Sequence, residues 1–466
     1  MATQVLPRSD NPQATLSIAS PLIAPTTPTP DPTRAADTRQ TELYIVQSGD
    51  TLDSIALEYG ATAQEVGQIN GLIDLASIQP GDPLNVPLHL DRVGPSTKLL
   101  PDSEFVYGPS TIDFDIKKFV DQTNGYLKSY TEELDGQTLT GAQIVQRVAE
   151  QYSVNPRLLL AVIDYRGGWL SNATPDASSQ YYPAGHHAET YAGLYQQLAW
   201  AANQLNDGYY GWRGRAMMTV RFNDFSRARI GVGLNAGTAG AEEFLARDDN
   251  FDTWQKDIGS AGLMATYQKW FGDPFQYSTA IVSAKLIQPP LSLPWPIGEV
   301  WYYTGGPHGG WASGSGWAAI DFTPPDMVSC FPSEYWVVAM SAGLVVRSEM
   351  GEVMVDLDGD GHEQTGWAIL YMHIADQDRV SVGTKLNAGD HIGHPSCTGG
   401  AANATHVHIA RRYNGEWIPA GGSIPLILDG WKVTGEATEY DGGLVSDDQV
   451  KVACECRDEA KNGIIR

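Results

Sequence analysis

The sequence predicts a multidomain α+β chain with a small mixed module, a helical middle region and an antiparallel β-sheet region. Its 466 residues are too many for one core, and domains usually span ~100–200 residues, so about three are expected. Residues 110–285 carry apolar side chains at helical spacing. From about residue 290, glycine and aromatic residues alternate with short strand-like runs that turn signals separate, which is typical of an antiparallel sheet.

Composition narrows the functional classes. A hydrophobic content of 42% and 13 tryptophans indicate folded domains. The formal net charge of −25 disfavours nucleic acid and anionic membranes as partners. No run approaches 18 apolar residues, so no transmembrane segment is expected. Four cysteines exclude a disulfide framework but allow one or two bridges.

The first 41 residues are predicted to be a disordered linker. The Pro/Thr-rich run Ala24–Thr33 has too few apolar residues for a core and favours an extended chain. No basic start followed by an apolar run of signal-peptide length is visible in residues 1–41. An exported protein would therefore need a signal that lies upstream, is unconventional or was removed.

Residues 43–87 predict a β-α-α-β unit. Alternating Tyr44 and Val46 indicate a strand, Thr51 can cap a first helix, and a second helix over about 62–69 ends at Asn70-Gly71. A Pro-Gly-Asp turn then leads to a last strand ending at Val86-Pro87.

This unit resembles a LysM module, with domain boundaries near 42–90. It matches the family's opening Y-x-V-x-x-G-D-T-L-x-x-I-A, its central N-x-L segment and its ending I-x-P-G-x-x-L-x-V-P. The resemblance implies binding of N-acetylglucosamine-containing glycan, which in bacteria is peptidoglycan. The alternative is a small αβ unit without a ligand.

Residues 110–285 predict a helical domain. The segment IVQRVAEQYSVNPRLLLAVIDYRGGW looks like the start of a soluble lytic transglycosylase (lysozyme-like) domain, and YAGLYQQLAWAANQL is similar to that family's G-L-x-Q block. The family has its acidic Glu followed by Ser where this chain has Arg166-Gly167, and arginine cannot protonate a glycosidic oxygen usefully. Asp164 is two residues away and would point elsewhere on a helix. We interpret the domain as degenerate and non-catalytic, a spacer or glycan-binding surface; an unrelated helical domain is the alternative.

Two histidines in the C-terminal region, His406 and His408, flank one valine and would share one face of a strand. Catalytic zinc sites use three protein ligands, commonly His, Asp or Glu, and leave a fourth position for water. His308 and Asp321 in a glycine-rich stretch, and His373 at the end of an apolar strand, are the further candidates.

This set resembles the lysostaphin/LytM-type zinc metallopeptidases, closest to the beta-lytic endopeptidase and staphylolytic protease (LasA) branch. The commonest family form, H-x-x-x-D, fails because Trp317 stands four residues before Asp321. The beta-lytic branch instead spaces this pair thirteen apart around a Ser-Gly-rich loop, as His308 and Asp321 are spaced here. The Y-x-H of Tyr371–His373, the H-x-H of 406–408 and the following Tyr413-Asn414-Gly415 also match.

The resemblance, which covers about 290–430, implies specific roles. His308, Asp321 and His408 would bind zinc, and His373 and His406 would be metal-free catalytic residues that line the open position. Zinc makes hydroxide available near neutral pH, and imidazole can accept or donate the protons of peptide hydrolysis. The predicted protein is an exported peptidoglycan hydrolase, extracellular or associated with the cell wall, whose LysM module tethers a zinc metalloendopeptidase that cuts peptide cross-links. The alternatives are a catalytically silent cell-wall-binding scaffold or activator, and a glycan-cleaving lysozyme-like enzyme.

An acidic stretch offers a second possible metal site. Asp356, Asp358 and Asp360 resemble the front half of a calcium loop, but Trp367 at the twelfth position excludes an EF-hand. The alternative is an acidic turn.

The cysteines and the C-terminal residues are the last features. Cys397 falls where the LasA branch has a disulfide cysteine, so a bridge with Cys330 is expected. Residues 431–466 are treated as a C-terminal tail, in which Cys454 and Cys456 are spaced too closely for an ordinary relaxed disulfide.

Overall fold

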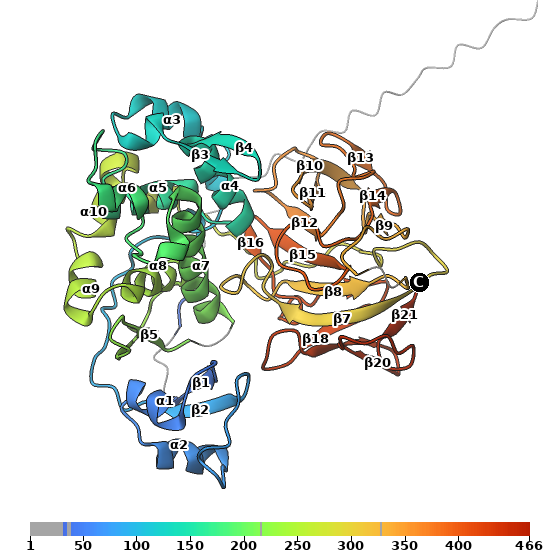
Figure 1. Cartoon of the computed structure of the whole chain (residues 1–466), viewed down its shortest axis with the longest axis horizontal. Helices are drawn as coiled ribbons and strands as arrows, with labels where there is room; N and C mark the ends of the chain where they lie inside the picture. The colour runs from blue at the N-terminus through green and yellow to red at the C-terminus, as the bar shows by residue number, and fades with distance from the viewer. Residues whose placement is uncertain (1–30, 35–38, 215–216, 327–328) are drawn as a thin grey trace, which may run out of the picture.

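The small N-terminal module has the predicted β-α-α-β order. A computed structural model describes residues 31–34, 39–214, 217–326 and 329–466 (Figure 1). Strands β1 (Thr41–Ile45) and β2 (Pro83–Pro87) pair antiparallel, and helices α1 (Leu52–Glu58) and α2 (Ala63–Asn70) pack against them. Most of the predicted linker lies outside the described residues, and Thr41 already belongs to β1.

Local chemistry explains where the module's helices begin and end. Thr51 and Thr62 each form a capping box at a helix N-terminus, with Ser54 and Glu65 respectively. Gly71 ends α2 in the left-handed conformation with φ of 67°, where a Cβ would be strained.

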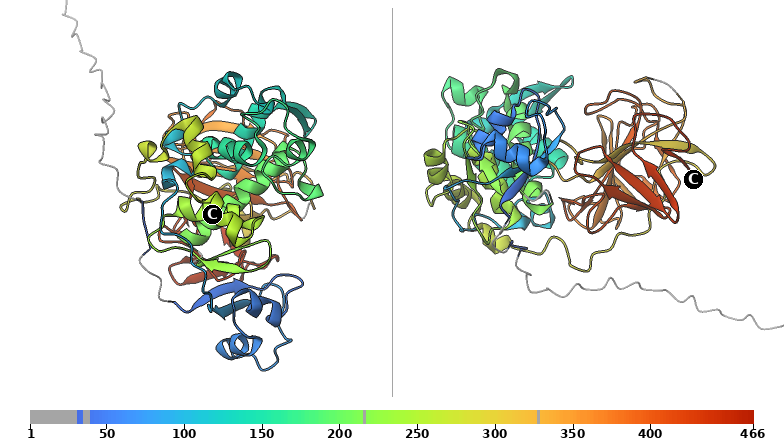
Figure 2. Two further views of the ribbon diagram at one scale, coloured as in Figure 1. Left: turned by 90° about the vertical axis from the view of Figure 1, so that its left-hand side faces the viewer. Right: turned by 90° about the horizontal axis from the view of Figure 1, so that it is seen from below.

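The module is anchored to the helical region by buried polar contacts. The Glu42 carboxylate accepts hydrogen bonds from the Met218 amide (2.9 Å) and the Thr219 hydroxyl (2.6 Å). Glu58 pairs with Arg221 at 2.7 Å and Arg227 at 3.1 Å. Both views of Figure 2 place the module against the helical region. It is therefore docked and is not held on a free linker.

The middle region is mainly helical, as predicted. Its long helices α4 (Gly141–Tyr152), α5 (Pro156–Gly167), α7 (Leu194–Arg213) and α8 (Ala236–Arg247) form the centre of one apolar core. Asn155 caps α5, and Pro156 occupies its first turn. The remaining elements are η1 (Asp102–Glu104), η2 (Pro109–Thr111), α3 (Ile116–Gln122), η3 (Tyr126–Ser129), β3 (Thr131–Leu134), β4 (Gln137–Thr140), α6 (Ala177–Tyr181), η4 (Glu189–Tyr191), β5 (Thr219–Arg221), β6 (Arg227–Arg229), α9 (Phe251–Asp257), α10 (Leu263–Phe271) and η5 (Pro274–Tyr277).

The C-terminal region is built on a nine-stranded antiparallel sheet. Its strand order is β13-β10-β11-β12-β15-β8-β7-β21, with β16 added on β15. The strands are β7 (Val300–His308), β8 (Ala319–Thr323), β10 (Gly343–Glu349), β11 (Glu352–Asp356), β12 (Trp367–Met372), β13 (Lys385–Leu386), β15 (Val407–Tyr413), β16 (Glu416–Trp417) and β21 (Gly463–Ile465). Two smaller sheets flank it, formed by β9 (Val337–Val338) with β14 (His391–Gly393), and by β17 (Ile427–Leu428), β18 (Trp431–Gly435), β19 (Gly442–Ser446) and β20 (Gln449–Val452).

The large sheet is buried on both faces. Alternate residues such as Ile320, Ile369 and Ile409 belong to a core within the sheet domain. Their neighbours Ala319, Leu370 and Ala410 belong instead to the core of the helical region. The sheet therefore joins the two halves of the molecule, which lie side by side in Figure 1.

The segment treated as a tail proves to be structured and corrects that expectation. Residues 431–466 form β18 to β21, and β21 pairs with β7, the strand that ends at His308. Cys454 and Cys456 form a disulfide despite their close spacing. The C-terminal residues thus complete the sheet that carries the candidate site.

Among the described residues, no helix is both long enough and apolar enough to span a membrane.

Candidate metal centre

The five predicted site residues lie on adjacent strands or directly beside them. His308 ends β7, Asp321 lies on β8, and His408 lies on β15 opposite Asp321. His373 follows β12, whose last residue, Met372, pairs with His408. Since these strands are neighbours in the sheet, residues up to 100 positions apart in the sequence meet at one end of it.

Three buried side-chain atoms of the predicted ligand set converge. His308 Nε2 lies 3.0 Å from His408 Nδ1 and 3.4 Å from Asp321 Oδ1, and His408 Nδ1 lies 3.3 Å from Asp321 Oδ1. His308 is 3% exposed, His408 is 6% exposed and Asp321 is 7% exposed. Asp321 Oδ1 is buried without a hydrogen-bond partner.

The outer hydrogen bonds determine which histidine nitrogens carry protons. His308 Nδ1 lies 2.8 Å from the Gly306 carbonyl oxygen, and His408 Nε2 lies 3.1 Å from that of Gly310. A carbonyl only accepts, so each of these nitrogens carries an N–H proton. When both rings are neutral, their inner nitrogens present lone pairs to each other and to the carboxylate. Three such atoms in mutual contact within a buried site could hold a metal ion between them.

This arrangement fits zinc. Tetrahedral zinc with bonds of about 2.0–2.1 Å separates neighbouring donor atoms by about 3.3 Å, close to the three separations here. Burial lowers the pKa of His408, which keeps the ring neutral. Burial alone would raise the pKa of Asp321, but the neighbouring histidines outweigh it and hold that pKa well below its usual range. Asp321 and His408 thus have the protonation states that metal binding needs. Burial alone lowers the pKa of His308, but the Asp321 charge outweighs it and raises that pKa, so zinc would displace a proton from this ring in mild acid.

The two histidines predicted to be metal-free lie beside this cluster. His406 Nδ1 donates to the Ala404 carbonyl oxygen at 2.8 Å, which leaves a lone pair on Nε2, 3.8 Å from Asp321 Oδ1. The rings of His373 and His406 have centroids 4.4 Å apart. Burial, helped by the neighbouring histidines, lowers the pKa of His373 to about 3, so this ring is neutral. Its Nδ1 is buried without a partner.

One neighbour of the site was missed from the sequence. The Tyr440 ring stacks on the His308 ring with centroids 4.2 Å apart. Its backbone is fixed on β7, because the Gly306 amide donates to the Tyr440 carbonyl at 2.7 Å and the Tyr440 amide donates to that of Pro307 at 3.2 Å. Tyr440 lies in the segment treated as a tail, and no local motif singles it out.

The acidic turn between β11 and β12 brings Asp356, Asp358 and Asp360 together. Their oxygens already accept hydrogen bonds from nearby groups. Asp356 accepts from the Asp358 and Gly361 amides, and Asp360 accepts from the His362 amide and the Thr365 hydroxyl. These hydrogen bonds fit the acidic-turn alternative, and a calcium site is not supported.

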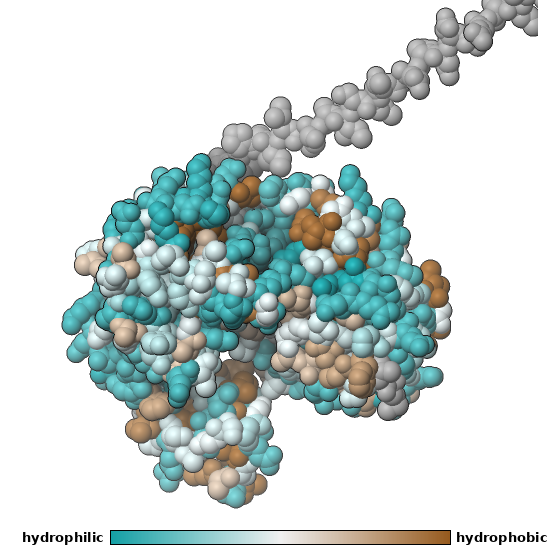
Figure 3. Space-filling view, turned by 45° about the horizontal axis from the view of Figure 1, so that its top comes forward, coloured by the Kyte–Doolittle hydropathy of each residue, from teal (hydrophilic) through white to brown (hydrophobic). Residues whose placement is uncertain are grey.

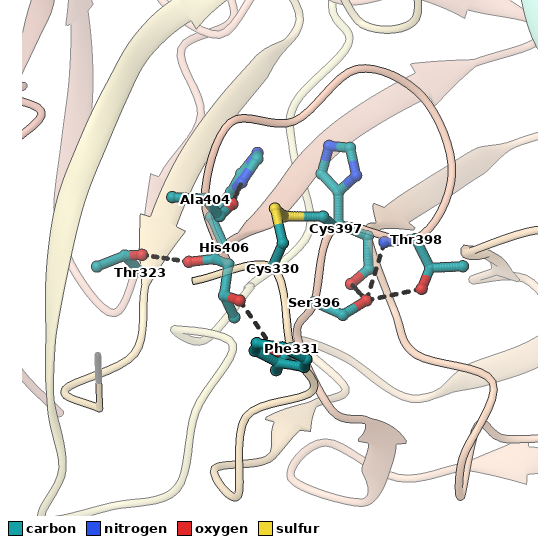
Figure 4. Close-up of a disulfide and its surroundings, with 10 residues drawn as sticks. Thr323, Cys330, Phe331, Ser396, Cys397, Thr398, Ala404 and His406 are labelled. Atoms are coloured by element: carbon teal, nitrogen blue, oxygen red, sulfur yellow. Dashed lines mark hydrogen bonds between the residues drawn. A yellow bond between two sulfur atoms is a disulfide. The ribbon is translucent and has the colours of Figure 1, made fainter. Parts of the chain in front are cut away.

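The expected disulfide is present. Cys330 and Cys397 are bonded, and Figure 4 places them next to Ser396, Phe331 and His406.

Two family models match the chain. Residues 44–87 match the LysM domain, and residues 98–285 match the domain described as LasA, N-terminal domain. The chain therefore carries a LysM domain, as expected, and its resemblance to the LasA branch extends to the helical region. The lysozyme-like interpretation of that region stays a prediction. No curated protein matches the chain.

Solved structures similar to this chain include several metallopeptidases. Pseudoalterin, a deep-sea M23 metalloprotease, is 20% identical over 39% of this chain and 100% of its own, with a TM-score of 0.30. The catalytic domain of lysostaphin from Staphylococcus simulans is 25% identical over 26% of this chain and 87% of its own, with a TM-score of 0.19. A zinc-containing peptidase from Vibrio cholerae is 18% identical over 23% of this chain and 30% of its own, with a TM-score of 0.18.

Proposed function

We propose that this protein is an exported, zinc-dependent endopeptidase that cuts peptide cross-links of bacterial peptidoglycan. The observation that carries the proposal is the contact of three metal-binding atoms, from His308, Asp321 and His408, with their lone pairs facing one another. The LysM domain and the LasA N-terminal match support a cell-wall substrate.

In this proposal His308, Asp321 and His408 would hold the zinc. Bound zinc lowers the pKa of a water molecule toward neutrality and polarises a carbonyl group. The remaining chemistry falls to side chains that do not bind the metal.

His406 is the proposed proton acceptor. Its Nδ1–H is fixed on Ala404, so Nε2 can take a proton from the attacking water. The resulting imidazolium would lie 3.8 Å from the Asp321 carboxylate, which stabilises its charge.

His373 is the proposed partner of the substrate. Burial keeps its ring neutral, and its unbonded Nδ1 is free for a group on the substrate. A neutral imidazole in that position can donate a hydrogen bond to the oxygen on which negative charge develops.

The position of the LysM domain also supports a polymeric substrate. A groove of about 590 Å³ runs between Gly81 and Pro83 of this domain and residues 434–443 of the sheet domain. The same 434–443 segment carries Tyr440, which stacks on His308. A polymer held in this groove would contact both domains. Apolar residues are also scattered over this small lobe at the bottom of Figure 3, on an otherwise largely hydrophilic face.

The glycan-cleaving alternative is disfavoured by the contacts of Arg166. Its guanidinium pairs with Asp249 at 2.7 Å and with Asp257 at 2.8 Å. Asp164 accepts hydrogen bonds from the Leu170 and Ser171 amides at 3.0 and 2.9 Å. These carboxylates are occupied in structural roles, so the helical region is proposed as a spacer or binding surface.

Product chemistry tests the proposal. Purified peptidoglycan would be incubated with the zinc-loaded protein and assayed for new amino groups and for new reducing or anhydro sugar ends. We expect amines without sugar ends. Sugar ends would favour glycan cleavage, and neither product in a zinc-loaded protein would favour the silent scaffold.

A further inference from the structure

The Cys330–Cys397 disulfide lies in a closed ring of contacts that links the two metal-free histidines (Figure 4). One half of the ring runs from Cys397 through Ser396 to His373. The other half runs from Cys330 through Phe331 and Thr405 to His406. Neither half includes a predicted metal ligand.

Ser396 fixes the backbone of His373. Both the Ser396 amide and its hydroxyl donate to the His373 carbonyl oxygen, at 2.7 and 2.9 Å. His373 has φ of 65°, a left-handed conformation that is uncommon for a residue other than glycine and needs support from its surroundings. The neighbouring Cys397 holds this supporting segment in place through the disulfide.

Phe331 fixes the residue before His406. The Thr405 hydroxyl donates to the Phe331 carbonyl oxygen at 2.9 Å, and the Thr405 carbonyl accepts from the Thr323 hydroxyl at 2.5 Å. The His406 amide closes the ring by donating to the Ser396 carbonyl oxygen at 3.4 Å. Ser396 and Thr405 are 1% and 3% exposed, so little water competes for these hydrogen bonds.

The ligand cluster is held by other contacts. Asp321 and His408 lie opposite each other in paired strands, and Asp321 also pairs with Gly305 of the strand that carries His308. These ladders do not pass through either cysteine. Loss of the disulfide would therefore loosen His373 and His406 while the three ligand atoms stay together.

We propose that the Cys330–Cys397 disulfide is a positioning element for His373 and His406, so that the protein binds zinc in either redox state but hydrolyses its substrate efficiently only when oxidised. This inference rests on the proposed endopeptidase function. Its consequence is a zinc-loaded but slow enzyme in a reducing compartment, which gains full activity in an oxidising one.

The bond is accessible to a reductant, because Cys330 is exposed and Cys397 is half-buried. Reduction by a water-soluble phosphine is balanced. The disulfide takes up two electrons and two protons to give two thiols, and the phosphine takes an oxygen atom from water to give its oxide. A phosphine avoids the zinc chelation that a dithiol would cause.

The test compares two double variants of the full-length protein. Cys330→Ser with Cys397→Ser removes the proposed positioning bond, and Cys454→Ser with Cys456→Ser removes the other disulfide as a matched control. We expect the first variant to keep one equivalent of zinc but to release amines from peptidoglycan about 10- to 100-fold more slowly, mainly through kcat, because small misplacements of catalytic groups have effects of that size. The control should match the wild type.

Two finer variants separate positioning from general stability. Ser396→Ala should reproduce part of the loss, and Ser396→Thr should restore it, because threonine keeps the hydroxyl that donates to His373. Zinc loss in the Cys330/Cys397 variant, or unchanged kcat with unchanged zinc, would overturn the inference.

A readout without substrate keeps the two proposals separable. Amide hydrogen exchange, followed by mass spectrometry, should speed up at residues 373–376 and 404–406 after reduction, while residues 319–323 and 407–411 stay protected. If the wild type cleaves nothing but shows this local pattern, the proposed function fails and the positioning role stands. Uniform exchange changes, or none, would refute the positioning role.

Discussion

His408 on β15 and His406, the residue before this strand begins, allow a direct separation of metal binding from catalysis. His406→Ala and His408→Ala remove the same ring from positions two residues apart. Only His408 contributes a nitrogen to the ligand cluster, whereas the His406 ring lies beside it. We expect His406→Ala to keep one equivalent of zinc and His408→Ala to lose it.

The two variants should also differ in magnitude. General acid–base groups contribute about 10²–10⁴-fold to rate, so His406→Ala should lower kcat by that factor, equivalent to about 3–5 kcal/mol in activation free energy. Zinc binding in proteins is worth about 10–16 kcal/mol where measured for structural sites. Divided over the three donors here, loss of His408 should weaken zinc binding by roughly 3–5 kcal/mol, or about 10²–10⁴-fold in Kd.

Zinc content would be measured by elemental analysis after dialysis, and kcat from amine release. A zinc-free His406→Ala protein would make His406 a ligand and would refute the assigned roles. Equal kcat values for His406→Ala and the wild type, with zinc bound in both, would refute its catalytic role.

Three other expectations follow from the electrostatics. Burial alone lowers the pKa of His308, but Asp321 outweighs it and raises that pKa above 6.5, so zinc must displace a proton from His308 in mild acid. Calorimetric titration should therefore show zinc affinity falling about tenfold per pH unit in that range. A zinc affinity that does not depend on pH would contradict this. Burial raises the pKa of Glu242 well above 4.5, and both of its carboxylate oxygens are without hydrogen-bond partners. The folded chain thus keeps a proton that the unfolded chain releases. The free energy of unfolding of the wild type should therefore fall relative to that of Glu242→Gln by about 1.4 kcal/mol per pH unit above pH 4.5. Urea unfolding midpoints measured across pH test this, and the same pH dependence of stability in both proteins would contradict it. Because carboxylates of the acidic turn already accept hydrogen bonds within the turn, millimolar calcium should not change the melting temperature of the zinc-loaded protein. A clear rise in the melting temperature that Asp358→Asn abolishes would instead show a calcium site.

The candidate site residues were proposed from the resemblance to a metallopeptidase family. The structure places His308, Asp321, His373, His406 and His408 close together, and their roles stay predictions. Short-range patterns also identified the LysM module, because its helix caps and turns depend on individual residues close in sequence, such as Thr51 and Gly71.

The features that the sequence analysis did not predict depend on contacts between residues far apart in the chain. Tyr440 reaches His308 only because the segment before β19 packs on β7, and β21 joins β7 from more than 150 residues away. Docking of the LysM domain depends on Glu42 and Glu58 meeting partners in the helical region, and no local pattern marks those pairs. The tail was therefore inferred from the absence of a local signal, which does not exclude long-range contacts.

The most direct test of the account is metal analysis of the purified full-length protein, combined with X-ray absorption at the zinc edge. The account predicts one equivalent of zinc bound by two imidazole nitrogens and one carboxylate oxygen, lost in His408→Ala, together with amine release from peptidoglycan that depends on that zinc. A protein that binds no zinc under these conditions would contradict the central claim, because the lone pairs of His308, Asp321 and His408 would then face one another without a cation.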